Sequence, residues 1–529
     1  MQVEQVGDES LNDDSEDPLR TDSATSNVAA GFRCPFARCD KHWQTSNSLV
    51  SHLLHLHSNS LSNLPPQFWK ALNRVYCTQC KRVFSTVRRG NWCTCLLQPN
   101  PAPQSPPLQS LLALWAQVSA TSPKVMTNIP FQFRSSFARL LSDCIQQILS
   151  NPSESTMVDL LLLPHLILRR PERSGKRHSR GVMDLLSARA AQWRAGLRSE
   201  LLSNSTVTQP SSRINRSLSP QTKFYKTVQR AAAEGSLSRA AKLLIQGQPL
   251  QCEAGSVQCL KETMEALHPT ETVQSPPDVP IDDQAIAQAS EIVTALKSFP
   301  TGTAAGPSGL RASHLHECLF QSGDAQVEQR LLSLVVEFVL FVISGKMPAQ
   351  VAVLLGGARL LPVPKSANAY RPIAIGETLR RLVGKVIVQI YGPILADDLA
   401  PEQFGVCRPG GMEAIIHDVN YWFKTLSQQN GCCILQLDFR NAFNTLSRGH
   451  ILSLLKHCPD CLRHYANFFC NGPLPLYGPG FQVTSSTGVQ QGDPCGPLLF
   501  SLGIHPLLRQ LSALDIEVRF YLDDGILYG

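Results

Sequence analysis

The chain has 529 residues, of which 43% are hydrophobic, and its formal net charge is +7. This length allows two or three domains with cores of their own. The longest apolar run, 331–343, is interrupted by Ser333 and Glu337 and falls short of the ~20 residues that a membrane-spanning helix needs. We therefore exclude a membrane protein and interpret this run as a buried helix.

The charge is unevenly distributed along the chain. Residues 1–30 hold eight acidic residues and one basic residue, so the remainder carries a net charge of +14. A basic body suits a polyanionic partner such as nucleic acid, although a merely soluble basic protein has the same balance. The acidic segment is rich in Ser and poor in aromatic residues, and we expect a disordered tail there.

The seventeen cysteines, several of them in paired spacings, indicate either disulfides or metal sites. The first residues lead into an acidic run and do not form a signal peptide. We therefore expect an intracellular, reducing compartment, with the nucleus as the expected location, and clustered cysteines that bind metal.

Residues 31–58 have the spacing of a zinc-binding module, C-x4-C-x12-H-x4-H. Thiolates and imidazoles at this spacing can close a tetrahedron around Zn²⁺, which replaces a core too small to fold alone. The expected ligands are Cys34, Cys39, His52 and His57. His55 is an alternative fourth ligand, because it lies on the same expected helix. The segment resembles a Cys2His2 zinc finger.

The resemblance to the finger places Thr45, Ser48 and Ser51 at the helix positions that read bases. Short hydroxyl side chains cannot make the bidentate contacts that arginine or asparagine make with base edges. Positioning on nucleic acid and contact with a protein therefore stay open beside sequence-specific recognition.

Residues 74–97 repeat part of this spacing with an all-cysteine set, which predicts a degenerate second zinc module; a partial cluster is the alternative. Its ligands would be Cys77, Cys80, Cys93 and Cys95. Residues 98–107 form a Pro-rich linker.

Apolar residues recur at helical spacing over 108–275, and this predicts a helical region. It contains a basic cluster, 169–180, for which nuclear import, RNA contact and a solvated loop all stay open. Two short helices are expected at 237–244 and 260–268. A Pro-rich break precedes the last region, 285–529.

The last stretch, 519–528, consists of two apolar runs around Asp523, Asp524 and Gly525. Asp-Gly between such runs is a strong hairpin signal, and adjacent carboxylates at the tip repel unless a cation lies between them. Upstream, 434–439 is expected to form another buried strand, with Asp438 at its end. Carboxylates at the ends of neighbouring strands can share two Mg²⁺ ions ~3.5–4 Å apart. A solvated turn is the alternative.

The stretch 520–524, Phe-Tyr-Leu-Asp-Asp, resembles the aromatic-x-Asp-Asp box of reverse transcriptases. Other stretches are similar to further boxes of that family in the same order: 361–365 with 370–373, 403–410, 438–444 and 488–494. Their order and spacing match the enzymes of non-LTR (LINE-like) retrotransposons over roughly 295–529. The resemblance implies an RNA-directed DNA polymerase, with an RNA template, a DNA primer or target and deoxynucleoside triphosphates as partners.

The resemblance also implies the fold and the site residues. We expect an α+β multidomain chain, with zinc modules, a helical region, and reverse-transcriptase fingers and palm in which an antiparallel sheet is backed by helices. Asp438 and Asp523 would bind the two Mg²⁺ ions, with Asp524 as a third carboxylate. The expected nucleotide-binding residues are Lys365 and Arg371 at the triphosphate, Phe443 under the sugar, and Gln491 and Gly492 beside the incoming nucleotide.

The family's later palm motif, primer grip and thumb would follow Gly529, so we expect a C-terminally truncated polymerase with the thumb absent, whose activity stays open. The rival function is a catalytically inert relic that acts only as a zinc-dependent nucleic-acid-binding protein.

Overall fold

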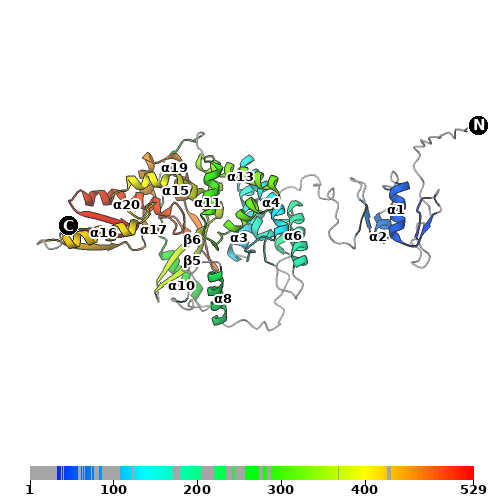
Figure 1. Ribbon diagram of the computed structural model, residues 1–529, viewed down its shortest axis with the longest axis horizontal. Helices are drawn as coiled ribbons and strands as arrows, with labels where there is room; N and C mark the ends of the chain where they lie inside the picture. Colours follow the sequence, from blue (N-terminus) through cyan, green and yellow to red (C-terminus); the bar gives the residue numbers. More distant parts are fainter. Residues whose placement is uncertain are drawn as a thin grey trace, which may run out of the picture. The chain divides into compact units, whose positions relative to one another are not determined.

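The computed structural model describes residues 32–529 except for 37–38, 40, 58–60, 62–63, 65, 73, 77–82, 86–107, 122–123, 171–178, 204–219, 234–240, 242–243, 245–255, 273–277, 283–286, 367–368 and 426–430. The chain divides into two compact units, Met1–Gln104 and Ser105–Gly529 (Figure 1). The expected acidic tail, the linker and the helix at 237–244 fall wholly or mostly outside the described residues.

The first unit begins with a small ββα module. Strands β1 (Phe32–Arg33) and β2 (His42–Trp43) pair antiparallel, and helix α1 (Ser46–Leu56) packs against them. A second helix, α2 (Pro66–Ala71), and an antiparallel hairpin, β3 (Arg74–Tyr76) and β4 (Val83–Ser85), follow. Leu49 and Leu53 of α1 share one core with Trp69 of α2, so the ββα module and the hairpin pack together.

The second unit opens with helices: α3 (Leu108–Thr121), α4 (Phe131–Ser150), α5 (Glu154–Ile167), α6 (Ser179–Arg194), α7 (Arg198–Ser203), α8 (Pro220–Ala233) and α10 (Ser256–Ala266). Helix α5 is apolar on nearly every face and is buried among α3, α4 and α6, as a helix without a polar face must be. Helix α10 contains most of the helix that the sequence predicts at 260–268, and that prediction is confirmed.

The next helices are α11 (Ala289–Lys297), α12 (Ala312–Phe320), α13 (Ala325–Ile343) and α14 (Ala349–Gly356). Helix α13 contains the apolar run predicted as a buried helix, and it packs against α4. The Glu317 carboxylate accepts hydrogen bonds from the Ile129 N–H (2.7 Å) and the Asn128 side chain (2.8 Å). One continuous core therefore joins the helical segment to the helices that follow it. None of the helices in the described residues is long and apolar enough to span a membrane.

Two sheets follow. The first has the order β6-β5-β8-β9 and consists of β5 (Ala358–Ser366), β6 (Ala369–Gly376), β8 (Leu474–Gly478) and β9 (Phe481–Ser485). It is mixed, because β5 pairs antiparallel with β6 but parallel with β8. The second is wholly antiparallel, with the order β10-β11-β7, and consists of β7 (Ile434–Asp438), β10 (Glu517–Tyr521) and β11 (Asp524–Tyr528).

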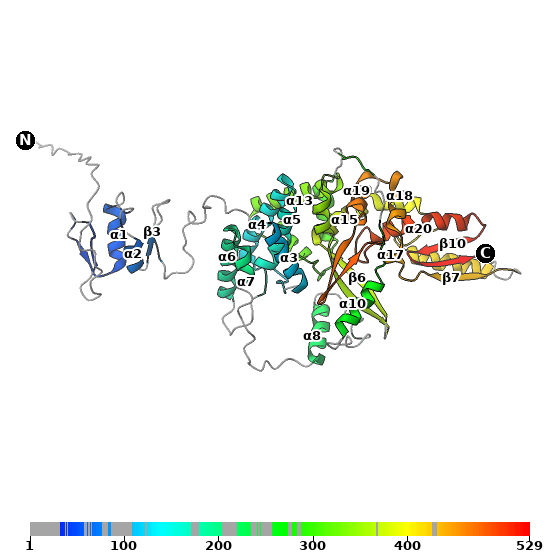
Figure 2. The ribbon, with the colours of Figure 1, turned by 180° about the vertical axis from the view of Figure 1, so that it is seen from behind.

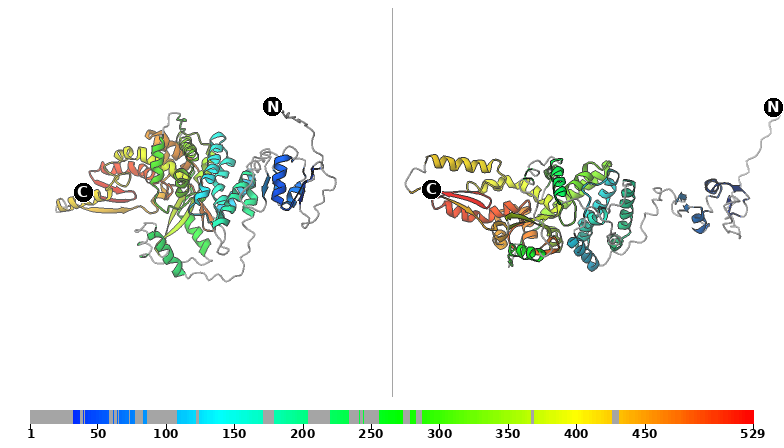
Figure 3. Two further views of the ribbon diagram at one scale, coloured as in Figure 1. Left: turned by 45° about the vertical axis from the view of Figure 1, so that its right-hand side comes forward. Right: turned by 90° about the horizontal axis from the view of Figure 1, so that it is seen from below.

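Helices cover the second sheet and connect it to the first: α15 (Thr378–Asp398), α16 (Gly411–Thr425), α17 (Ala442–Thr445), α18 (Arg448–Leu454), α19 (Asp460–Cys470) and α20 (Gly496–Ser512). Both α16 and α20 contact β10, so the antiparallel sheet is backed by helices (Figure 3). Within this unit, α3, α4 and α6 lie at one end and the β10–β11 hairpin lies at the other (Figure 2).

Two local expectations are wrong. Strand β7 is not buried, because Ile434 and Leu435 are 49% and 53% exposed. Among the described strands β7 pairs only with β11, so an apolar run in this position is half solvated. The hairpin forms, but its turn is Leu522-Asp523 and not Asp524-Gly525, because Tyr521 pairs with Asp524 and Phe520 with Gly525.

Gly525 serves packing and not the turn. A Cβ atom at this position would lie 2.2 Å from the ring of Phe520, which is fully buried and has no room to move. The position therefore accepts only glycine while Phe520 keeps its place.

Gly525→Ala should lower the free energy of unfolding by ~1–3 kcal/mol, the usual cost of overpacking a core. Gly472→Ala is the matched control, because a Cβ there meets nothing within 4 Å. Urea denaturation of both variants checks this; equal stability of the two would show that Phe520 adapts at little cost.

Candidate active site

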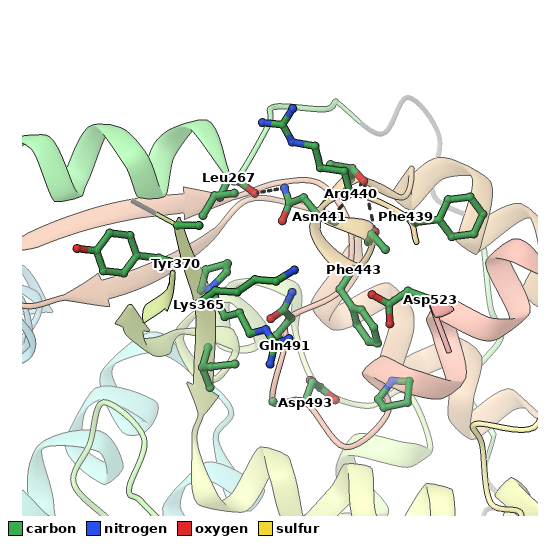
Figure 4. Close-up of a pocket in the computed structure, with 18 of the residues that line it drawn as sticks. Leu267, Lys365, Tyr370, Phe439, Arg440, Asn441, Phe443, Gln491, Asp493 and Asp523 are labelled. Carbon is green, nitrogen blue, oxygen red and sulfur yellow. Dashed lines mark hydrogen bonds between the residues drawn. The ribbon is translucent and has the colours of Figure 1, made fainter. Parts of the chain in front are cut away.

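A cleft of about 1430 Å³ opens between the β5–β6 hairpin and the antiparallel sheet. It is lined by all eight residues that the sequence predicts for catalysis and nucleotide binding: Lys365, Arg371, Asp438, Phe443, Gln491, Gly492, Asp523 and Asp524. Figure 4 shows Lys365 beside Tyr370, across the cleft from Phe443 and Asp523. Residues separated by up to 159 positions in the sequence thus share one cavity.

The three carboxylates come together through strand register. Asp438 ends β7, and Asp524 begins β11 directly opposite it. Asp523 lies in the two-residue turn between β10 and β11. Burial raises the pKa of the Asp523 carboxyl, and the charges of Asp524 and Asp438 raise it further. A cation in the cleft would relieve this repulsion, because it favours the ionised form.

The turn itself is held from outside the hairpin. Leu522 has a left-handed backbone (φ 57°), which is costly for a residue with a branched side chain. The Gln403 side chain holds it by accepting from the Leu522 N–H (2.8 Å) and donating to the Leu522 carbonyl (3.2 Å). Gly405 allows this close contact, since a Cβ there would lie 2.6 Å from the Leu522 nitrogen. The 403–405 stretch therefore positions Asp523.

Phe443 is fixed between two elements. Its ring stacks on the buried ring of Phe500, with centroids 4.6 Å apart and an interplanar angle of 11°. Its carbonyl accepts from the Val489 N–H (2.7 Å). The N-cap of the helix that carries it, Asn441, has a left-handed backbone and donates to the Leu267 carbonyl (2.8 Å; Figure 4). Phe443 thus both packs and lines the cleft, so the two interpretations of this residue are compatible.

The loop with Gln491 and Gly492 is attached to the β5–β6 hairpin. The Ala374 N–H donates to the Gln491 carbonyl (2.8 Å). Gly492 has φ +122°, and a Cβ there would lie 2.5 Å from the Ala374 carbonyl oxygen. The close approach that needs this glycine is therefore that of strand β6.

A buried ionic network around Asp493 holds the loop that contains Gln491 and Gly492. The Asp493 carboxylate pairs with the Arg380 guanidinium and accepts from the Tyr465 hydroxyl (3.0 Å to each oxygen). Arg380 also donates to the Gly356 carbonyl (2.7 Å) and to the Gln490 side chain (3.0 Å). Burying two opposite charges is tolerable here because both have further hydrogen-bond partners.

The sequence missed three cations of the cleft, Arg381, Lys385 and Arg440. Arg381 and Lys385 line it one turn apart on α15 and lie over the Phe299 ring, 5.6 Å and 5.0 Å from its centroid. Burial, and then the charge of Arg381, lower the pKa of Lys385. Their i, i+4 spacing was a usable signal. Helix α10 adds Thr263 and Ala266 to the cleft wall, which nothing in its sequence indicated.

The expected ligands of the first zinc module also converge. One potential ligand atom from each of Cys34, Cys39, His52 and His57 lies within 4.8 Å of the others. Cys39 Sγ is 3.3 Å from His52 Nε2, and Cys34 Sγ is 3.6 Å from His57 Nε2. Two ligands of one tetrahedral zinc are expected roughly 3.5 Å apart, given bonds of ~2.3 Å to sulfur and ~2.0 Å to nitrogen.

The surroundings of His52 favour its neutral form. Burial, with smaller contributions from His57 and Lys41, lowers the pKa of His52, and a neutral imidazole is the form that binds metal. His57 lies in this group, whereas the side chain of the alternative, His55, falls outside the described residues. In the part of the chain that the structure describes, this is the only such group of Cys, His, Asp or Glu; the three cleft carboxylates are more widely spaced. The expected ligands Cys77, Cys80, Cys93 and Cys95 are outside the described residues.

The predicted base-reading side chains of the finger are partly engaged. Thr45 caps α1 by accepting from the Ser48 N–H (3.2 Å), and its hydroxyl bonds to the Ser48 hydroxyl (2.8 Å). Asn47 of the same turn bonds to Arg74 of β3. The start of this helix is therefore occupied by contacts within the first unit.

In the full chain, Cys34→Ser should lower the zinc content, because the site would lose one of its four expected ligands. Cys259→Ser, at an exposed cysteine of α10, should leave it unchanged. Metal analysis of the two purified variants measures this. Equal zinc content in both would exclude Cys34 as a ligand.

Comparison with known proteins agrees with this geometry. Residues 363–529 match the family described as reverse transcriptase (RNA-dependent DNA polymerase). The match begins further along the chain than the resemblance from about residue 295, but it includes all eight predicted cleft residues.

Three proteins of retrotransposable elements are similar to the chain. It is 26% identical over 280 residues to the retrotransposable element SLACS 132 kDa protein of Trypanosoma brucei gambiense, which covers 50% of this chain and 22% of that protein. It is 27% identical over 174 residues to the retrovirus-related Pol polyprotein from the type-2 element R2DM of Drosophila melanogaster, which covers 30% of this chain and 16% of that protein. It is 28% identical over 160 residues to the retrovirus-related Pol polyprotein from the type-1 element R2 of Popillia japonica, which covers 28% of this chain and 22% of that protein.

The chain thus spans about a fifth of the length of each of these relatives. Residues 363–529 of this chain are therefore a reverse transcriptase domain, and the chain is similar to proteins of retrotransposable elements.

Proposed function

We propose that the chain catalyses RNA-directed DNA synthesis as part of a non-LTR retrotransposon protein. The observation that carries this proposal is the convergence of Asp438, Asp523 and Asp524 in one cleft with cations on the opposite wall. In such a cleft the carboxylates can bind metal ions, while the cationic side chains bind the negatively charged triphosphate. Its partners are an RNA template, a DNA primer or target and deoxynucleoside triphosphates.

The carboxylates suit Mg²⁺, which prefers oxygen ligands and binds proteins through one or two carboxylates plus substrate phosphates. Asp438 and Asp523 would hold the ions, and the raised pKa of Asp523 fits a site that a cation completes. When bound, the ions would lower the pKa of the primer 3′ hydroxyl and neutralise the charge of the leaving pyrophosphate. Asp524, at the start of β11, is the third carboxylate of the set.

The remaining residues orient the nucleotide. Lys365 and Arg371 protrude from the β5–β6 hairpin, and Arg371 is close enough to Asp523 to lower its pKa. These cations bind the triphosphate, Arg371 through its planar fork and Lys365 as a point charge. Phe443 lies under the sugar, and the loop with Gln491 and Gly492 borders the base. Braced by Phe500, the Phe443 ring resists displacement by an extra hydroxyl.

The zinc module is part of the proposal. It binds Zn²⁺ through Cys34, Cys39, His52 and His57 and contributes nucleic-acid binding. The contacts of Thr45, Ser48 and Asn47 within the first unit favour a positioning role over reading of base sequence. An inert relic that only binds nucleic acid has no need for the intact carboxylate set.

Primer extension on an RNA template tests the polymerase. Asp523→Asn should abolish synthesis, because ions displaced by ~1 Å already cost ~100-fold in rate. Asp143→Asn, at an exposed surface position, is the matched control and should extend normally. If the wild-type chain binds nucleic acid but makes no DNA, the result supports the inert relic instead.

Phe443 should select the sugar. Phe443→Ala should relax discrimination against ribonucleotides by roughly 10- to 100-fold, the usual value of one excluded group. Phe443→Tyr keeps the ring and should keep the selectivity. Single-nucleotide extension with paired deoxy- and ribonucleotides measures this. Unchanged selectivity in the alanine variant would assign Phe443 to packing against Phe500 alone.

A further inference from the structure

A second hollow, of about 240 Å³, shares no residue with the catalytic cleft. It lies between the segment before α4, the end of α5, the loop before α12 and the start of β5. Its charged lining residues are Lys124, Arg170, Arg311 and Arg359. None of the described residues that line it is acidic, so four cations border a space smaller than a typical drug-sized site. We call it the basic pocket.

Arg359 is the residue that requires a partner. Its guanidinium Nε is buried and has no hydrogen-bond partner, and burial, then the charge of Arg311, lower its pKa. The carboxylate that acts on it is Glu377, whose two oxygens already accept from the Ser308 N–H (2.7 Å) and hydroxyl (2.5 Å). A half-buried guanidinium beside a second one is costly unless an anion completes its hydrogen bonds.

The walls of the basic pocket are fixed before any ligand arrives. The Arg170 N–H donates to the Lys124 carbonyl (2.8 Å), and its guanidinium donates to the Thr127 hydroxyl (2.7 Å). The His165 ring donates to the Pro307 carbonyl (2.7 Å). Gly309 has φ +78°, and a Cβ there would lie 2.5 Å from Val125. These contacts hold Arg170 and the backbone of the pocket walls in place, so little order of these parts is lost on binding.

We propose that the basic pocket binds one phosphate group. A phosphate offers enough charge and enough acceptor oxygens for several cations, and a guanidinium binds it through two parallel hydrogen bonds. Arg359 begins the strand whose far end carries Lys365, six residues and roughly 20 Å away, so the pocket is a site separate from the triphosphate cations. The group belongs either to free phosphate or to a nucleic-acid backbone. Arg170, which lines the pocket, belongs to the basic segment 169–180. The proposal therefore gives this residue of the segment a role in binding phosphate.

Thermal melting of the full chain in inorganic phosphate, against chloride of equal ionic strength, tests the site. Phosphate should raise the melting temperature of the wild type, and Arg359→Gln should remove this shift. Arg330→Gln, at an exposed arginine of α13, should keep it, and so should Lys365→Gln, which removes a cation of the catalytic cleft. Loss of the shift in Lys365→Gln, with Arg359→Gln unaffected, would place phosphate in the cleft and overturn the proposal.

A second arm identifies the source of the phosphate. Binding of a single-stranded oligonucleotide is measured over a salt series, where each lost phosphate contact should lower the slope of log affinity against log salt by roughly 0.7. A lower slope in Arg359→Gln assigns a backbone phosphate; an unchanged slope with a lost melting shift assigns free phosphate. Lys124→Gln, at an exposed lysine, covers the case in which Arg359→Gln does not fold. If neither variant changes the melting shift or the slope, the proposal is wrong.

Discussion

The fold of the catalytic region depends on one strand register. Because β11 pairs with β7 so that Asp524 faces Asp438, the turn residue Asp523 is brought to the same edge of the sheet. Burial, and then the charges of Asp524 and Asp438, raise the pKa of Asp523, so the surroundings must hold the turn against that repulsion. A slip of one residue would turn every side chain of β11 to the other face and scatter the set.

Several elements secure this register. The Phe520 N–H donates to the Glu402 carbonyl (2.7 Å), and the Phe404 N–H donates to the Phe520 carbonyl (2.8 Å), so the 402–404 stretch covers part of the outer edge of β10. Helix α16 contacts both strands of the hairpin: its Asp418 carboxylate accepts from the Arg519 guanidinium (2.6 Å) and from the Tyr528 hydroxyl (2.5 Å). Packing around Phe520 and polar contacts to α16 therefore act together on a hairpin with a two-residue turn.

The sequence could predict the members of the cleft but not how they are held. Asp438, Asp523 and the 488–494 loop lie in stretches that resemble motifs of reverse transcriptases. Because these motifs occur in the family's order, the resemblance predicts that their residues lie in one site. The turn position was misjudged because Asp-Gly is a local signal, whereas the packing of Phe520 against Gly525 is tertiary. The exposure of β7 was misjudged for a related reason, since an apolar run does not reveal how many neighbours its strand has.

The basic pocket and the buried ionic network could not be predicted from the sequence. Arg170, Arg311 and Arg359 are spread over 190 positions, and no local pattern joins them into a pocket. The ionic network of Arg380 and Asp493 likewise depends on α15 meeting the loop before α20. The proposed first zinc module is the opposite case, because its four expected ligands lie within 24 residues and their spacing alone predicts their convergence.

The central claim is that the carboxylate cleft is a divalent-cation site. Titration of the zinc-loaded chain with Mn²⁺, followed by electron paramagnetic resonance, measures it directly, because free and bound Mn²⁺ give different signals. We predict Mn²⁺ binding by the wild type that weakens sharply in Asp438→Asn and in Asp523→Asn, and that competes with Mg²⁺. Mn²⁺ binding of equal strength in the wild type and both variants would contradict the account.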